Sequence, residues 1–195
     1  ITSLEKVKKI NVSGWILGGW IDEEDEFVTI SIPRGTEKPR HGEVNKASEV
    51  WLKPNESAIV LTGETPVGVS FKLNKCFGYL TQFQDFVPDF AKLCPTPSEE
   101  RWSDDLSENC TNYLSTIPRC RVPLSFPSGL EEECTEEISE KLNYNYCVNN
   151  YARDKDFYIP EWRLYLGFDR ELWSNSGETI TLYDSDGLLV DTLTY

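Results

Sequence analysis

The stretch Ile10–Leu17, read Ile-Asn-Val-Ser-Gly-Trp-Ile-Leu, decides the fold that the sequence predicts. A turn of small residues leads directly into Trp15 and two large apolar residues. Gly14 lets the backbone bend where the indole of Trp15 enters a core, because glycine adopts conformations that other residues avoid. We therefore expect a strand before this turn and partner strands as far as Leu61.

Further strand-like segments surround this stretch, and each is bounded by a turn signal. They are Phe27–Ile32 before Pro33, Val50–Leu61 with an internal Pro54-Asn55 turn, Trp162–Leu166 after Pro160, Thr179–Tyr183, and Leu188–Tyr195. The last two flank Asp184–Gly187, whose Asp-Gly pair is typical of a β-hairpin. Short strands at this spacing predict a β-sandwich.

All six cysteines lie in one part of the chain, at Cys76, Cys94, Cys110, Cys120, Cys134 and Cys147. This local density is typical of a disulfide framework in an oxidising compartment. Zinc is the alternative, but structural zinc sites use close pairs of cysteines, and successive cysteines here lie 10 to 18 positions apart. The pairing stays open, and links between sequence neighbours, such as Cys110 with Cys120 or Cys134 with Cys147, are only examples.

Helical periodicity is confined to the same part of the chain. One apolar stripe runs from Leu106 to Ile117 and ends at Pro118, and a second recurs every fourth residue from Leu130 to Leu142. We therefore predict a mainly β fold, α+β overall. Residues 1–62 and 161–195 form the β-sandwich, and residues 63–160 are inserted into it as a disulfide-stabilised helical lobe.

Three segments, Asn11–Leu17, Leu52–Asn55 and Gly177–Asp184 with the hairpin that follows, together resemble the lamin tail domain. The resemblance covers residues 1–62 and 161–195 and implies an immunoglobulin-like β-sandwich. No heptads precede it, a cysteine-rich segment interrupts it, and its acidity does not suit chromatin. It therefore points to the exported bacterial type, whose members are accessory modules with a binding or scaffolding role. The family's first strand is only partly present from Ile1, which leaves an edge for a partner to complete.

The charge balance narrows the classes of partner. The chain has 33 acidic and 19 basic residues and a net charge of -14, so it has no basic footprint for nucleic acid. No apolar run is long enough to span a membrane. We expect partners to be proteins or glycans at the cell surface. Because the chain begins at Ile1 and lacks Met, we also expect it to belong to a larger polypeptide.

A cluster of tyrosines and asparagines is the predicted binding site. It comprises Tyr144, Tyr146, Asn149, Asn150 and Tyr151. Tyrosine supplies contact area at a low entropic cost, and asparagine offers paired donors and acceptors that suit sugar hydroxyls or a protein surface. The alternative is that these aromatic residues fill the core of the lobe itself.

The sequence predicts neither a catalytic nor a metal site. His41 is the single histidine and lies in a polar loop, and the usual nucleophile and phosphate-loop motifs are missing. A hydrolase that uses a pair of carboxylates is an alternative, because two of the acidic residues could converge. We expect no cofactor. Calcium is an alternative at the acidic turns Asp22–Glu26 and Asp184–Gly187, although turns favour these residues without an ion.

Together these observations predict an extracellular or cell-surface, non-enzymatic binding or scaffolding module. The inserted lobe would present the interaction surface, and the sandwich would supply rigidity. A carbohydrate-binding module is the alternative that the tyrosine and asparagine cluster motivates.

Overall fold

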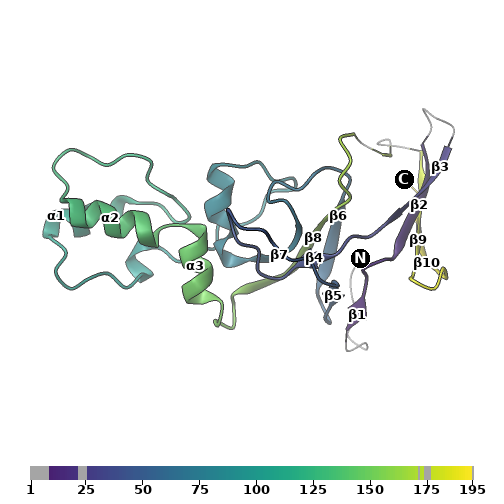
Figure 1. The fold of residues 1–195 in the computed structure, drawn as a ribbon, viewed down its shortest axis with the longest axis horizontal. Helices are drawn as coiled ribbons and strands as arrows, with labels where there is room; N and C mark the ends of the chain where they lie inside the picture. The colour runs from purple at the N-terminus through teal and green to yellow at the C-terminus, as the bar shows by residue number, and fades with distance from the viewer. Residues whose placement is uncertain (1–8, 22–25, 171, 174–176, 195) are drawn as a thin grey trace. The chain divides into compact units, whose positions relative to one another are not determined.

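A computed structural model describes residues 9–21, 26–170, 172–173 and 177–194 (Figure 1). The chain divides into two compact units. The sheet unit comprises residues 1–73 and 160–195, and the disulfide unit comprises residues 74–159. With 22% helix and 26% strand, the fold is α+β. The predicted insertion began at residue 63, whereas the disulfide unit begins at Asn74.

One sheet of the sheet unit is antiparallel, with the strand order β10-β9-β2-β3. Its strands are β2 (Ile16–Ile21), β3 (Glu26–Ser31), β9 (Thr179–Tyr183) and β10 (Leu189–Thr194). The predicted hairpin is confirmed, because β9 pairs antiparallel with β10 across the Asp-Gly turn. Asp184 Oδ1 closes this turn by accepting the backbone N–H groups of Asp186 and Leu188, each at 2.9 Å.

A second sheet has the order β4-β7-β8-β6, and two of its pairings are parallel. Its strands are β4 (Gly35–Thr36), β6 (Ser57–Leu61), β7 (Ser70–Asn74) and β8 (Tyr158–Tyr165). A short antiparallel pair joins β1 (Ile10–Asn11) to β5 (Trp51–Leu52). Strand β7 was not predicted, and neither were the parallel pairs. The immunoglobulin-like arrangement stays a prediction.

The core of the sheet unit forms around Trp162, which is 1% exposed. The other buried members of this cluster are Val12, Ile32, Val50, Leu52, Ala58 and Leu164. Gly14 has a φ of +79°, and Trp15 packs against the cluster directly after it. The predicted role of this turn is therefore confirmed: it directs the indole toward the core.

A buried ion pair lies beside this core. Lys72 Nζ is 2.5 Å from Glu56 Oε1, and the Lys72 side chain is only 2% exposed. The second oxygen of Glu56 accepts the N–H of Lys53 at 3.0 Å. The ammonium also lies 5.8 Å from the centre of the Trp162 ring. Both buried charges thus have partners, which a core position requires.

The disulfide unit contains the α-helices of the described chain. Its elements are the 3₁₀ helices η1 (Lys75–Gln82) and η2 (Pro97–Glu99) and the α-helices α1 (Glu108–Thr116), α2 (Glu132–Lys141) and α3 (Tyr144–Tyr151). The two predicted helical stripes are confirmed as α1 and α2. Helix α3 was not predicted, because its asparagines and tyrosines are weak helix formers.

Three disulfides cross-link this unit: Cys76–Cys147, Cys94–Cys120 and Cys110–Cys134. The predicted disulfide framework is therefore confirmed, and the zinc alternative is wrong because all six thiols are consumed. The sequence-neighbour pairings were also wrong. Cys110 and Cys134 lie on different helices, α1 and α2, with their Cα atoms 5.9 Å apart, a separation typical of a bridged pair.

Gly78 provides the first test of this packing. A Cβ atom built on it would lie 2.8 Å from Cys120 Cβ and 2.9 Å from Cys94 Sγ. Gly78→Ala should therefore destabilise the disulfide unit by about 1–3 kcal/mol, because the bridge cannot move aside without strain. Urea unfolding followed by the helical circular-dichroism signal measures this change. The control is Gly63→Ala, which would meet no atom within 4 Å. Equal stability of the two variants would contradict the packing described.

Candidate functional site

Helix α3 positions the predicted binding residues. Asn143 caps its first turn, because the side-chain oxygen accepts the N–H of Tyr146 at 2.9 Å. The helical repeat then divides the side chains between two faces. Tyr144, Cys147 and Val148 are buried on the inner face, and the disulfide from Cys147 joins this face to η1.

Tyr144 belongs to the core of the disulfide unit. It is 3% exposed, and its hydroxyl accepts the side-chain N–H of Asn74 at 3.3 Å. Its ring meets Phe77 edge to face, with the ring centres 5.4 Å apart. The alternative interpretation, in which the aromatic residues fill the lobe, therefore describes Tyr144, and a partner would not reach it without unfolding.

The remaining predicted residues separate into two groups. Tyr146 is half-buried, and Asn149 and Asn150 are exposed on the opposite side of the helix from Tyr144. These three residues form what we term the α3 outer face. Asn150 also donates its amide to the carbonyl of Tyr146 at 2.9 Å, which orients it along the helix. Tyr151 lies in the inner stripe instead.

Tyr151 lies beside a buried carboxylate that the sequence did not single out. Glu100 is 8% exposed, and the Tyr151 hydroxyl is hydrogen-bonded to it. Burial raises the pKa of Glu100 above its usual range, and the hydrogen bond from Tyr151 and the charge of Lys141 oppose this rise. Among the described residues, Glu100 Oε1 is buried without a hydrogen-bond partner.

Two tyrosines respond to this carboxylate. Burial, followed by the charge of Glu100, raises the pKa of Tyr79, and burial and the Glu100 hydrogen bond raise the pKa of Tyr151. Both phenols therefore stay protonated and can donate. Lys75 lies 5.1 Å from the centre of the Tyr151 ring and pairs with Asp154 at 2.8 Å. In the sequence Glu100 follows another glutamate, and a pair of glutamates is typical of a solvent-exposed surface. No sequence pattern therefore indicates that Glu100 is buried.

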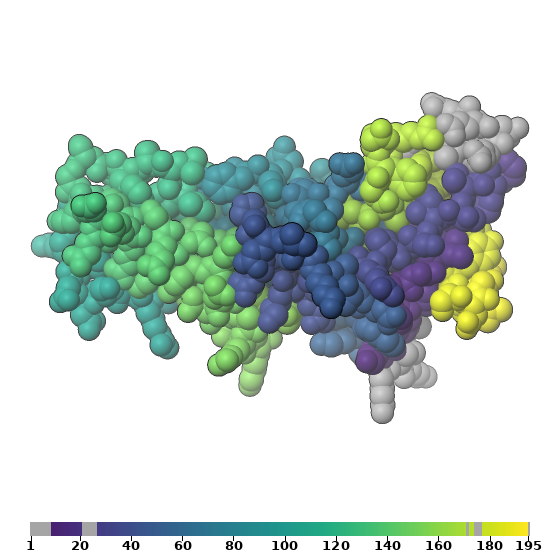
Figure 2. Space-filling view, in the orientation of Figure 1, coloured from purple at the N-terminus to yellow at the C-terminus, as the bar shows by residue number. Residues whose placement is uncertain are grey.

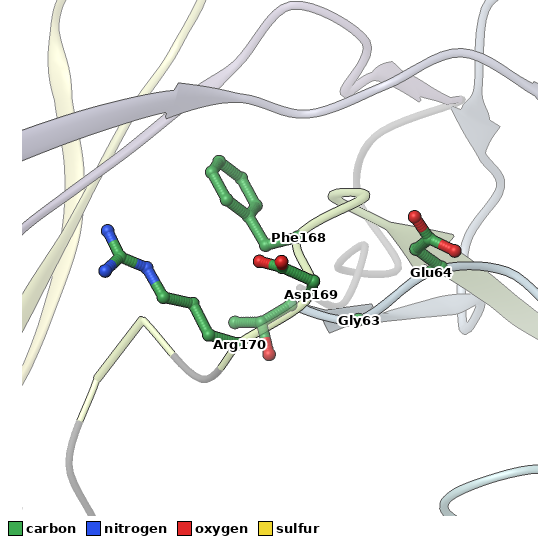
Figure 3. Close-up of a pocket in the computed structure, with 6 residues that line it drawn as sticks. Gly63, Glu64, Phe168, Asp169 and Arg170 are labelled. Atoms are coloured by element: carbon green, nitrogen blue, oxygen red, sulfur yellow. The ribbon is translucent and has the colours of Figure 1, made fainter.

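An open pocket lies where two parallel strands end. Because β6 and β8 run in parallel, the segments that follow them meet at one edge of the sheet. Phe168 N–H donates to the carbonyl of Thr62 at 2.9 Å, and Gly167 N–H donates to that of Gly63 at 3.2 Å. The pocket has a volume of about 470 Å³ and is lined by Thr62, Gly63, Glu64, Phe168, Asp169 and Arg170 (Figure 3).

This pocket brings two carboxylates from different segments to one place, which bears on the hydrolase alternative. Figure 3 shows the carboxylate of Asp169 turned away from Glu64, while the guanidinium of Arg170 extends outward. A glycosidase pair must face one bond of the substrate from both sides. Glu64 and Asp169 both line the pocket, and the hydrolase alternative stays a prediction.

The other sequence candidates occupy turns and loops. His41 is exposed in a turn. Asp184 is engaged in closing the hairpin, and within the described residues no three histidine, cysteine or acidic side chains gather where they could hold a metal ion. The acidic turn Asp22–Glu26 and the segment from Ile1 lie outside the described residues, apart from the backbone of Glu26.

Comparisons with known proteins add no further assignment. No protein-family model, no curated protein and no solved structure matches the chain. Within the described residues, none of the helices has the length and apolar character needed to cross a membrane.

Glu100 provides a test in which pH is the variable. The pKa of Glu100 is raised in the folded state, whereas a glutamate in an unfolded chain has a pKa of about 4.3. As pH rises from about 4, Glu100 loses its proton at a lower pH in the unfolded chain than in the folded chain. Its ionisation therefore lowers the free energy of unfolding progressively. Relative to wild type, Glu100→Gln should therefore gain stability from about pH 4 to pH 7. Urea unfolding at a series of pH values measures the difference.

The neighbouring Glu99 is a control of opposite sign. Hydrogen bonds from Thr96 hold the pKa of Glu99 below its usual range. Ionised Glu99 stabilises the fold at pH values above the pKa of an unfolded glutamate, and this stabilisation is lost as pH falls below it. Glu99→Gln should therefore lose stability relative to wild type as pH rises through the acid range toward about 4.3, and should then run parallel to wild type up to about pH 7. If both variants diverge from wild type in the same direction, the environment assigned to Glu100 is wrong.

Proposed function

We propose that the chain is an extracellular or cell-surface, non-enzymatic binding or scaffolding module. The observation that carries this proposal is the pairing of all six cysteines into three disulfides within the disulfide unit. Such bonds persist in oxidising compartments and are reduced in the cytosol. The module would have a protein or a glycan at the cell surface as its partner.

The disulfide unit would present the interaction surface through the α3 outer face. The bridge from Cys147 to Cys76 and the Asn143 cap hold α3 against its unit. The amides of Asn149 and Asn150 therefore project from a rigid support, so a partner would order few side chains on binding. Because these side chains are uncharged and hydrogen-bonding, they suit a polar protein surface.

The resemblance to the exported bacterial type of lamin tail domain agrees with this proposal. Two of the segments that carry it have a structural role, because Gly14 turns Trp15 onto the core and the Asp184 hairpin pairs β9 with β10. We include the family assignment, and the immunoglobulin-like arrangement that it implies, in the proposal. A binding or scaffolding role would follow from it.

The compartment can be tested by counting thiols. The chain, isolated from its native source, should take up no alkyl group under denaturing, non-reducing conditions and six after reduction. Mass spectrometry of the intact chain measures both numbers. Uptake of six groups without reduction would mean that the protein works in a reducing compartment, and the proposal would fail.

The α3 outer face can be tested with two matched double variants. Fluorescently labelled chain is titrated onto intact cells of the source organism. Asn149→Ala/Asn150→Ala should bind at least about fivefold more weakly, because it removes amides from the centre of the surface. Asn109→Ala/Asn112→Ala, which alters exposed asparagines of α1 in the same unit, should bind as wild type. Equal binding by both variants would place the contact elsewhere.

A further inference from the structure

The antiparallel sheet of the sheet unit has one face turned toward the core and one turned away. Leu182 packs against the core cluster, and the register places Leu17 and Ile30 in the same row. Gly19 lies on this inner face as well, where it contacts the indole of Trp173. Alternate residues of each strand therefore point away from the core.

We term this opposite side the outer face of the sheet. The strand pairings place its residues in cross-strand rows, namely Leu189, Tyr183, Ile16 and Ser31; Thr192, Thr181, Gly18 and Thr29; Thr194 and Thr179; and Trp20 and Phe27. Most of them are exposed. The β10 residues in these rows, Leu189, Thr192 and Thr194, are exposed, and Figure 2 shows this strand (yellow) uncovered at the surface.

Two large aromatic side chains lie at one end of the outer face. Trp20 is 53% exposed and Phe27 is 45% exposed, and their ring centres are 5.9 Å apart. Gly18 leaves room for the Phe27 ring, because a Cβ atom at this position would lie 2.8 Å from the end of the ring. The ring therefore lies over β2 instead of standing clear of the sheet. Large apolar groups held at a surface in this way mark a binding site.

The rest of the outer face carries rows of threonine hydroxyl groups. Thr29, Thr181 and Thr192 lie in one cross-strand row, and Thr181 donates to the carbonyl of Gly18 at 3.1 Å. Thr179 and Thr194 form a second pair, with their hydroxyl oxygens 2.9 Å apart. Thr29 and Thr192 can each donate and accept, whereas Thr181, whose proton is engaged, can accept, so the row can match either type of group on a ligand.

The charge of this face indicates the kind of ligand. Within its described rows there is no charged side chain, although the whole chain carries a net charge of -14. An anionic ligand would be repelled by the protein as a whole, and a cationic one would be drawn to the acidic residues outside this face. The outer face is thus complementary to an uncharged partner that combines apolar ring faces with many hydroxyl groups.

We propose that the outer face of this sheet binds a neutral polysaccharide chain. The apolar faces of its sugar rings would stack on Trp20 and Phe27, and its hydroxyl groups would pair with the threonine rows. This site lies in the sheet unit and does not rest on the α3 outer face, so it goes beyond the function proposed above. It also gives the carbohydrate-binding alternative a different location from the tyrosine and asparagine cluster.

The test measures retention of the full chain on insoluble neutral polysaccharides, namely glucan, mannan, xylan and chitin, with polygalacturonate as the anionic control. The chain should be retained by at least one neutral polymer, without loss on addition of salt, since no ion pair is involved. Trp20→Ala should lower the affinity for that polymer about tenfold or more, as loss of an aromatic anchor does. Thr192→Glu should also weaken binding, because it buries a charge under the sugar chain.

Matched variants separate this proposal from the others. Trp51→Ala removes a partly exposed tryptophan of the same unit that is not in this sheet, and it should bind as wild type. Asn109→Ala/Asn112→Ala, in the disulfide unit, should also bind as wild type. Because the α3 outer face is tested on intact cells with other residues, failure of one proposal leaves the other intact. Thermal unfolding confirms that each variant is folded. Retention on none of the neutral polymers, or equal retention of Trp20→Ala and wild type, would overturn the proposal. So would a dimer in light scattering that Thr192→Glu dissociates, because a second copy would then cover the face.

Discussion

The disulfide unit depends on covalent links between short elements. Its helices are about two to three turns long, and helices of this length are marginal in water without tertiary support. The Cys76–Cys147 bridge joins η1 to α3, and Cys110–Cys134 joins α1 to α2. Because each bridge ties segments distant in sequence, the loops between them are restrained even without regular structure.

Glycine provides close packing in both units, and in each case a bulky group occupies the space that a side chain would fill. Gly78 lies under the Cys94–Cys120 bridge, while Gly18 and Gly19 receive an aromatic ring on opposite faces of β2. In the sheet unit this arrangement produces two different surfaces from one strand. The Trp173 indole lies against the inner side of β2, and the Phe27 ring lies against its outer side.

Elements with a local signal could be predicted from the sequence. The Asp184–Gly187 turn, the apolar stripes of α1 and α2 and the density of cysteines each depend on neighbouring residues. Strand β7 was missed because its buried residues include Lys72, whose charge suggests solvent until its partner Glu56 is known. The disulfide pairing, the parallel strands and the burial of Glu100 depend on distant residues. For the same reason Tyr144 and Asn149, close in sequence, differ in burial.

The connections of the disulfide unit also bear on how such a chain could diversify. The chain leaves the second sheet at the end of β7 and returns through β8, and these two strands are neighbours in the sheet order. Adjacent strands can be joined by a short turn as readily as by a folded unit, since the entropy of closing a loop grows only slowly with its length. This connection is therefore a position where one folded unit could be exchanged for another while the sheet unit stays unchanged.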